Sequence, residues 1–149
     1  MKTRRFLVVV LLLFASAAPV WRDDLAAFVD PLKTRAAQGE AKAQTILGIL
    51  YDEGRGVPQD NAEALKWYRL AAAQGDALAQ YHLGLMYAKG YGVPQDHIEA
   101  HKWFTLAAAS STSKPNRDRA VEARDKLAAR MTPTQIAEAQ KLAREWKKQ

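Results

Sequence analysis

Apolar residues recur at helical intervals through the middle of the chain. Ala43, Leu47 and Tyr51 follow one another at four-residue steps, which places them on one face of a helix over residues 41–53. A second stripe, made of alanines and one large aromatic side chain, runs through residues 61–73. Both patterns return 36 residues later along the chain. They predict two pairs of amphipathic helices and an all-α fold.

The helical patterns belong to an internal duplication. Residues 41–76 and 77–112 align without a gap and are identical at 20 of 36 positions. A repeat of this period is typical of a helical solenoid, in which antiparallel helix hairpins pack side by side. Gly48 and Gly84 recur in the middle of the first helix of each unit, where glycine costs about 1 kcal/mol relative to alanine. We therefore expect the neighbouring helix to leave no room for a side chain at these positions.

Each unit contains a glycine-rich loop between its two helices, GRGVPQD at residues 54–60 and GYGVPQD at residues 90–96. The first glycine can end a helix in a left-handed conformation, and the proline prevents the next helix from extending backwards. Asp60 then stands at an N-cap, with Glu63 three residues later as in a capping box. A phosphate site would need the glycines directly at a helix start with a lysine behind them. The loop is therefore predicted to be structural.

The pattern LG..Y..G.GV..D...A..W[YF]..AA, present in both units, resembles the Sel1-like repeat, a relative of the tetratricopeptide repeat with a longer loop inside its hairpin. The resemblance covers residues 41–109. It implies an α/α superhelix that acts as an adaptor or scaffold between proteins, and it implies no catalytic residues.

The two ends of the array diverge from the repeat. Residues 18–40 contain a second-helix sequence over residues 23–38, which we expect to be interrupted near Pro31 and to form a degenerate half-repeat. Residues 113–149 lack the glycine loop but keep helical spacing. Within them Thr132 is followed by a proline and, at the third position, a glutamine, the start of a capped helix. We expect this segment to form a C-terminal cap hairpin.

The N-terminal residues have the pattern of a secretory signal. A basic head precedes the apolar run from Phe6 to Phe14, and small residues follow in an A-x-A pattern. The run is shorter than the ~20 residues that a membrane-spanning helix needs. Residues 1–17 are therefore predicted to be a cleaved signal peptide and residues 18–149 a periplasmic or secreted domain, with no stable membrane insertion after cleavage.

Charge and cysteine content narrow the classes of partner. The net charge is +6, and the C-terminal part from Lys114 onward carries ten basic against five acidic residues. Both signs alternate along helical sequence there, so a solvated surface is favoured over a nucleic-acid footprint, which would be one-sided. The chain has no cysteine, so it has neither disulfides nor a thiol nucleophile.

Two histidines have the spacing of metal ligands. His97 and His101 lie four residues apart in the sequence HIEAH, but the glutamate is displaced from its place in the zincin motif and no third ligand is nearby. A surface or half-buried pair is favoured over a zinc site. Adjacent carboxylates such as Asp23 and Asp24 point apart on a helix. No catalytic, cofactor-binding or metal-binding residue is predicted.

The predicted function is a non-catalytic scaffold of the bacterial cell envelope that binds a protein or peptide. The alternative is an envelope hydrolase, as proposed for cysteine-rich exported Sel1-like proteins, although this chain lacks their cysteines. Resemblance to tetratricopeptide grooves places the binding surface on the first helix of each unit, with the alternative that these residues only fill gaps between units. The predicted groove residues are Lys42, Thr45, Ile49, Asp52, Leu78, Tyr81, Leu85 and Ala88.

Overall fold

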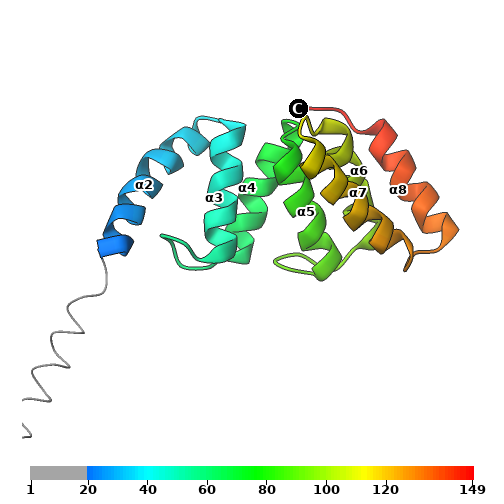
Figure 1. Ribbon diagram of the computed structural model, residues 1–149, viewed down its shortest axis with the longest axis horizontal. Coiled ribbons are helices and arrows are strands. Elements are labelled where there is room, and N and C mark those ends of the chain that lie inside the picture. Colours follow the sequence, from blue (N-terminus) through cyan, green and yellow to red (C-terminus); the bar gives the residue numbers. More distant parts are fainter. Residues whose placement is uncertain (1–19) are drawn as a thin grey trace, which may run out of the picture.

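The computed structural model describes residues 20–149, and all regular structure in this part is helical. Successive helices pack against each other in a row, so the predicted α/α solenoid is confirmed (Figure 1). The predicted signal peptide lies outside the described residues. The helices are α2 (Val20–Ala37), α3 (Ala41–Glu53), α4 (Asn61–Ala73), α5 (Ala77–Lys89), α6 (His97–Ser110), α7 (Lys114–Ala128) and α8 (Pro133–Glu145).

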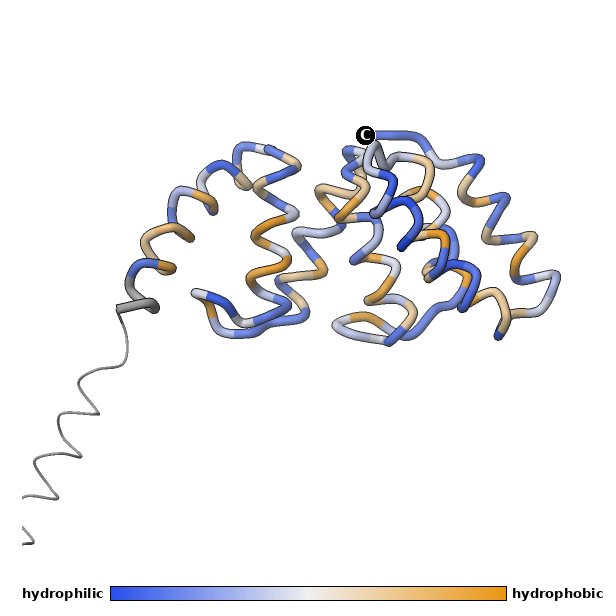
Figure 2. The backbone as a smooth tube through the Cα atoms, in the orientation of Figure 1, coloured by the Kyte–Doolittle hydropathy of each residue, from blue (hydrophilic) through white to orange (hydrophobic). Residues whose placement is uncertain are grey.

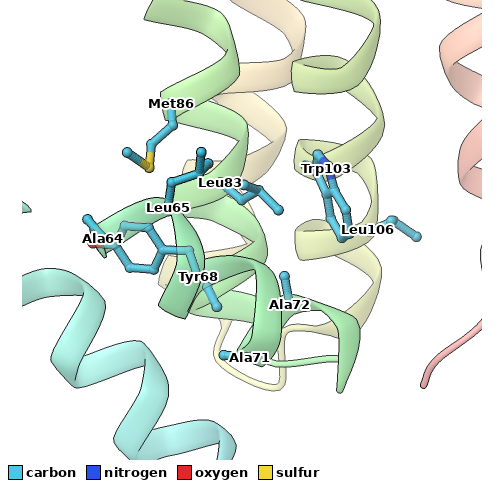
Figure 3. Close-up of a cluster of buried hydrophobic side chains, with 10 residues drawn as sticks. Ala64, Leu65, Tyr68, Ala71, Ala72, Leu83, Met86, Trp103 and Leu106 are labelled. Atoms are coloured by element: carbon cyan, nitrogen blue, oxygen red, sulfur yellow. The ribbon is translucent and has the colours of Figure 1, made fainter. Parts of the chain in front are cut away.

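The hydrophobic core runs along the row as three adjoining clusters. Apolar and polar segments alternate along the helices (Figure 2). One cluster joins α2 to α3 through residues such as Val29 and Leu47. The largest joins α4, α5 and α6, with Tyr68 and Leu83 at its centre (Figure 3). The last joins α5 and α6 to α7 around Phe104. The core is thus shared between neighbouring units, as expected for a solenoid.

Each full hairpin contains a close contact between a glycine and an aromatic ring. A Cβ atom added to Gly48 would lie 2.7 Å from a ring carbon of Tyr68, and one added to Gly84 would lie 2.7 Å from the ring of Phe104. Both rings are almost fully buried. The expectation that a neighbouring helix leaves no room at these glycines is confirmed, and the neighbour is the second helix of the same unit.

The C-terminal helices keep the spacing of the repeat but lose this contact. Ala120 stands 36 residues after Gly84 and is buried, while the position 36 residues after Phe104 is the exposed Gln140. Without an aromatic ring to accommodate, an alanine fits on α7. Helices α7 and α8 both pack against α6 and make few contacts with each other. The predicted cap is present, but it is held together through α6.

The C-terminal residues after α8 run along the cap and reach the first repeat. Beyond α8, the ring of Trp146 meets that of Trp103 edge-on, with 6.2 Å between centroids. The backbone N–H of Gln149 donates to the carbonyl of Ala73 at the end of α4. The tail therefore bridges α4 and α6, which belong to different units.

Buried glutamines join neighbouring units. The Gln44 side chain donates from Nε2 to the carbonyl of Ala36 at 3.1 Å, and Gln80 donates equivalently to Ala72 at 3.3 Å. Each bond adds a second donor to a carbonyl in the last turn of the preceding helix, which also accepts from the N–H of Gly39 or Gly75. Gln74 completes the first pair by donating to Gln44 Oε1. Gln80 Oε1 has no hydrogen-bond partner among the described residues.

The expectation of a break near Pro31 is wrong, because α2 runs without interruption from Val20 to Ala37. Proline removes one backbone donor, whose acceptor would be the carbonyl of Ala27. Both residues are exposed, so water can bind that carbonyl. The opposite face of α2, with Val29 and Leu32, is buried against α3 and holds the helix straight through the proline.

Replacing Gly84 by alanine should destabilise the protein. Alanine favours a helix by about 1 kcal/mol, but here its methyl group must displace the Phe104 ring, and overpacking costs about 1–3 kcal/mol. We expect a net loss of about 1 kcal/mol in the free energy of urea unfolding. In a double-mutant cycle, Gly84→Ala should cost less in a Phe104→Leu background. A more stable single variant would contradict the packing role of the glycine.

Candidate functional site

The glycine loops pack against the preceding unit. Gly54 ends α3 with φ 66°, and its N–H donates to the carbonyl of Leu50. A Cβ on the next glycine, Gly56, would lie 2.8 Å from Leu25 of α2. In the second loop, a Cβ on Gly92 would lie 2.7 Å from the carbonyl oxygen of Asn61, the residue 36 positions after Leu25. Each loop therefore contacts the second helix of the preceding unit at an equivalent position.

The remaining loop residues satisfy the backbone at both helix ends. Asp60 Oδ1 accepts from the N–H groups of Ala62 and Glu63, at 2.9 and 3.1 Å, so the predicted N-cap is confirmed. The glutamate does not complete a capping box, since its carboxylate pairs with Lys66. The side chain of Gln59 donates to the carbonyl of Asp52 at 2.8 Å, a role that the sequence analysis missed. This loop is built as a structural connection, and its counterpart at residues 90–96 has the same bonds.

The predicted groove residues of α3 lie partly between the two units. Thr45 is 2% exposed, and its hydroxyl donates to a carboxylate oxygen of Asp76 at 3.0 Å. Ile49 packs against the cluster that joins α4 to α5 and α6. Asp52 is half-buried, whereas Lys42 is exposed. The structure therefore brings Thr45 and Ile49 into the joint and leaves Lys42 at the surface.

The predicted groove residues of α5 divide in the same way. Tyr81, Leu85 and Ala88 are half-buried against the cluster that joins α5 to α7. Leu78 remains 37% exposed. On α3 the sequence analysis missed Ile46, which is 41% exposed and lies between two buried residues of the predicted pattern. The sequence distinguishes such an isoleucine from its buried neighbours only by its angular position on the helix.

A small pocket opens beside Leu78, between α5, the end of α6 and the start of α7. Its walls include Tyr81 from α5 and Ala107 from α6. Asn116 and Arg119 of α7 supply its polar side. Its volume is about 10 Å³, close to the room that one water molecule needs, so it is a shallow apolar depression with a cationic edge.

His82 lies at the joint between the two units. Its ring stacks on Tyr68 of the first unit, with 5.0 Å between centroids and 10° between planes. Burial lowers the pKa of His82, and Arg119 lowers it further, while Asp52 and other nearby carboxylates act in the opposite direction. Burial likewise raises the pKa of the Tyr68 hydroxyl, which has no hydrogen-bond partner among the described residues.

The two histidines of the HIEAH sequence differ in burial. His101 is buried, and burial lowers its pKa. His97 is half-buried at the first position of α6. Within residues 20–149, no group of three or more His, Asp or Glu side chains is arranged to hold a metal ion.

Comparison with known proteins identifies the repeat. The family model of the Sel1 repeat matches residues 41–76 and 77–111, so the second match ends one residue before the predicted boundary. The chain therefore contains two Sel1 repeats. Among curated proteins, none matches the chain.

Two solved structures are similar to this chain. One is c5321, described as a protective antigen present in uropathogenic Escherichia coli strains displaying an SLR fold, with 33% identity and a TM-score of 0.73. The other is a Sel1 repeat protein from Oxalobacter formigenes, with 29% identity and a TM-score of 0.57. Both alignments cover 79% of this chain. The chain spans 24% of the first protein and 54% of the second.

Lowering the pH from 7 to 5 should destabilise the fold. His82 and His101 have lowered pKa values in the folded protein, whereas an unfolded histidine titrates near pH 6.5. The unfolded state therefore binds more protons in this window, and stability falls as the pH falls. His82→Gln should reduce this dependence in thermal melts followed by circular dichroism. An unchanged slope in that variant would exclude His82 as a source.

Proposed function

We propose that the protein is a non-catalytic scaffold that binds a partner protein or peptide on the face formed by α3, α5 and α7, here called the A-helix face. Sel1 repeats commonly serve in protein interaction. The observation that carries the proposal is Leu78, an apolar side chain 37% exposed at the mouth of the pocket lined by Tyr81 and Arg119. A contiguous apolar patch with a polar rim is typical of an interaction surface, and Leu78 and Tyr81 lie together beside Asn116 and Arg119.

Fewer residues are proposed to contact the partner than the eight groove residues predicted from the sequence. Lys42 and Leu78, at equivalent positions of the two units, are exposed on the A-helix face and are the proposed contact residues. Tyr81 is the wall of the pocket and also contacts the cap, so its replacement should affect stability as well as binding. No feature of the described residues favours the alternative of an envelope hydrolase.

We also propose that the scaffold acts in the cell envelope, in the periplasm or after secretion. The support is the basic head, the apolar run from Phe6 to Phe14 and the small residues up to Ala17. In the part of the chain that the structure describes, no helix is long and apolar enough to cross a membrane. A partner is therefore sought among envelope proteins.

Leu78→Ser should remove partner binding without changing the melting temperature, because Leu78 makes part of the open pocket wall. A photo-crosslinking amino acid at position 78 in living cells, followed by mass spectrometry, should identify one envelope protein. The matched control is Leu70 on α4, which is 45% exposed outside the A-helix face. Loss of the identified partner from pulldowns with Leu70→Ser but not with Leu78→Ser would contradict the proposed surface.

N-terminal sequencing of protein from the envelope fraction should find a mature chain that begins at Ala18, or at Pro19 as the lesser product. The reason is the A-x-A pattern at Ala15 to Ala17, which a signal peptidase recognises. Full-length protein with Met1 in the cytoplasmic fraction would contradict export while leaving the binding surface untouched.

A further inference from the structure

Helix α2 ends the row with one face uncovered by the described chain (Figure 1). In the next unit, the corresponding face of α4 carries Ala64 and Ala71, which are fully buried and flank Tyr68, whose ring lies against Gly48 of α3. The residues 36 positions earlier are Phe28 and Arg35, both exposed, and Phe28 is 54% exposed. An interior second helix therefore has an antiparallel neighbour at this face, and α2 does not have one among residues 20–149.

The start of α2 differs from the starts of α4 and α6. In the two repeats, a seven-residue loop connects the first helix to the second, as in residues 54–60. The corresponding positions before α2 are residues 18–24, and α2 already begins at Val20. Most of the connection that a repeat hairpin needs is thus part of the helix itself.

The uncovered face of α2 is self-complementary. Asp24, Phe28, Pro31 and Arg35 are all exposed and follow at steps of four, three and four, which forms one stripe along the helix. The stripe has an acidic end, an apolar middle and a basic end. Read in the opposite direction, it offers the matching order of basic, apolar and acidic groups.

We propose that α2 pairs with α2 of a second copy of the chain in antiparallel orientation about a two-fold axis. Asp24 of each copy then faces Arg35 of the other, and Phe28 of each copy contacts Pro31 of the other. A two-fold axis brings the same patch of both copies together, so a patch must complement itself. The second copy supplies the antiparallel helix that α4 finds in α3.

The neighbouring side chains are compatible with this pairing. Arg35 binds Glu40 of its own chain through Nε and Nη2. An arginine offers five N–H donors, so Nη1 can still bind a carboxylate. Ile46 lies 36 residues before His82, the residue that stacks on the preceding unit, and it is 41% exposed. It extends the apolar middle of the interface onto α3.

The test is analytical ultracentrifugation of the protein as recovered from the envelope, at concentrations from micromolar to millimolar. The wild type should form a reversible dimer, since one pair of helices buries less than a stable interface of about 1,200 Å² needs. Asp24→Arg and Arg35→Asp should each weaken dimerisation at least tenfold, because each variant opposes like charges. An equimolar mixture of the two variants should form a heterodimer, since the altered charges then match.

The matched control is Asp30→Arg, a charge reversal at an exposed position of α2 outside the stripe. It should dimerise like the wild type. Circular dichroism melts of each variant verify that the chains are folded before mixing. A wild type that is monomeric at every concentration overturns the proposal. So does a dimer that survives either single reversal, or a mixture of folded variants that stays monomeric.

Discussion

The architecture depends on how closely the two helices of a hairpin approach each other. At Gly48 and Gly84 the distance to the facing ring is too short for any side chain. The ring of Tyr68 or Phe104 therefore lies directly on the backbone of the first helix and fills the centre of the hairpin. The alanines that recur in the second helix follow from the same close approach, because larger side chains would separate the helices. Where the pair is lost, at Ala120 and Gln140, the two cap helices no longer form a tight hairpin.

The interior of the fold was largely predictable from the sequence because its constraints are local. A glycine in mid-helix, an aspartate before a helix and a glycine after one each have a short-range physical cause. Because the unit is duplicated, each of these residues occurs at the same position in both copies. The N-cap of Asp60, the left-handed Gly54 and the tight Gly48 could be identified in this way, and so could the core position of Tyr68.

The ends and the binding surface were less predictable because they depend on packing between distant segments. Periodicity places Thr45 and Tyr81 on a face of their helices, but it does not tell whether that face meets solvent or the next helix. The structure shows that a hydrogen bond to Asp76 and the cap helix α7 cover much of it. Pro31 was misjudged for the same reason, since burial of Val29 and its neighbours against α3 outweighs the lost backbone bond.

The loops give the array a property that its two units alone do not display. Gly56 lies close to Leu25 of α2 and Gly92 lies close to Asn61 of α4, so each loop contacts the second helix of the preceding unit at an equivalent position. The Gln44 and Gln80 side chains likewise bind only the last turn of that helix. A unit thus carries all the contacts required to follow another unit of its own kind. Tandem duplication of 36 residues can lengthen such a chain in a single genetic step, with every new joint already complementary.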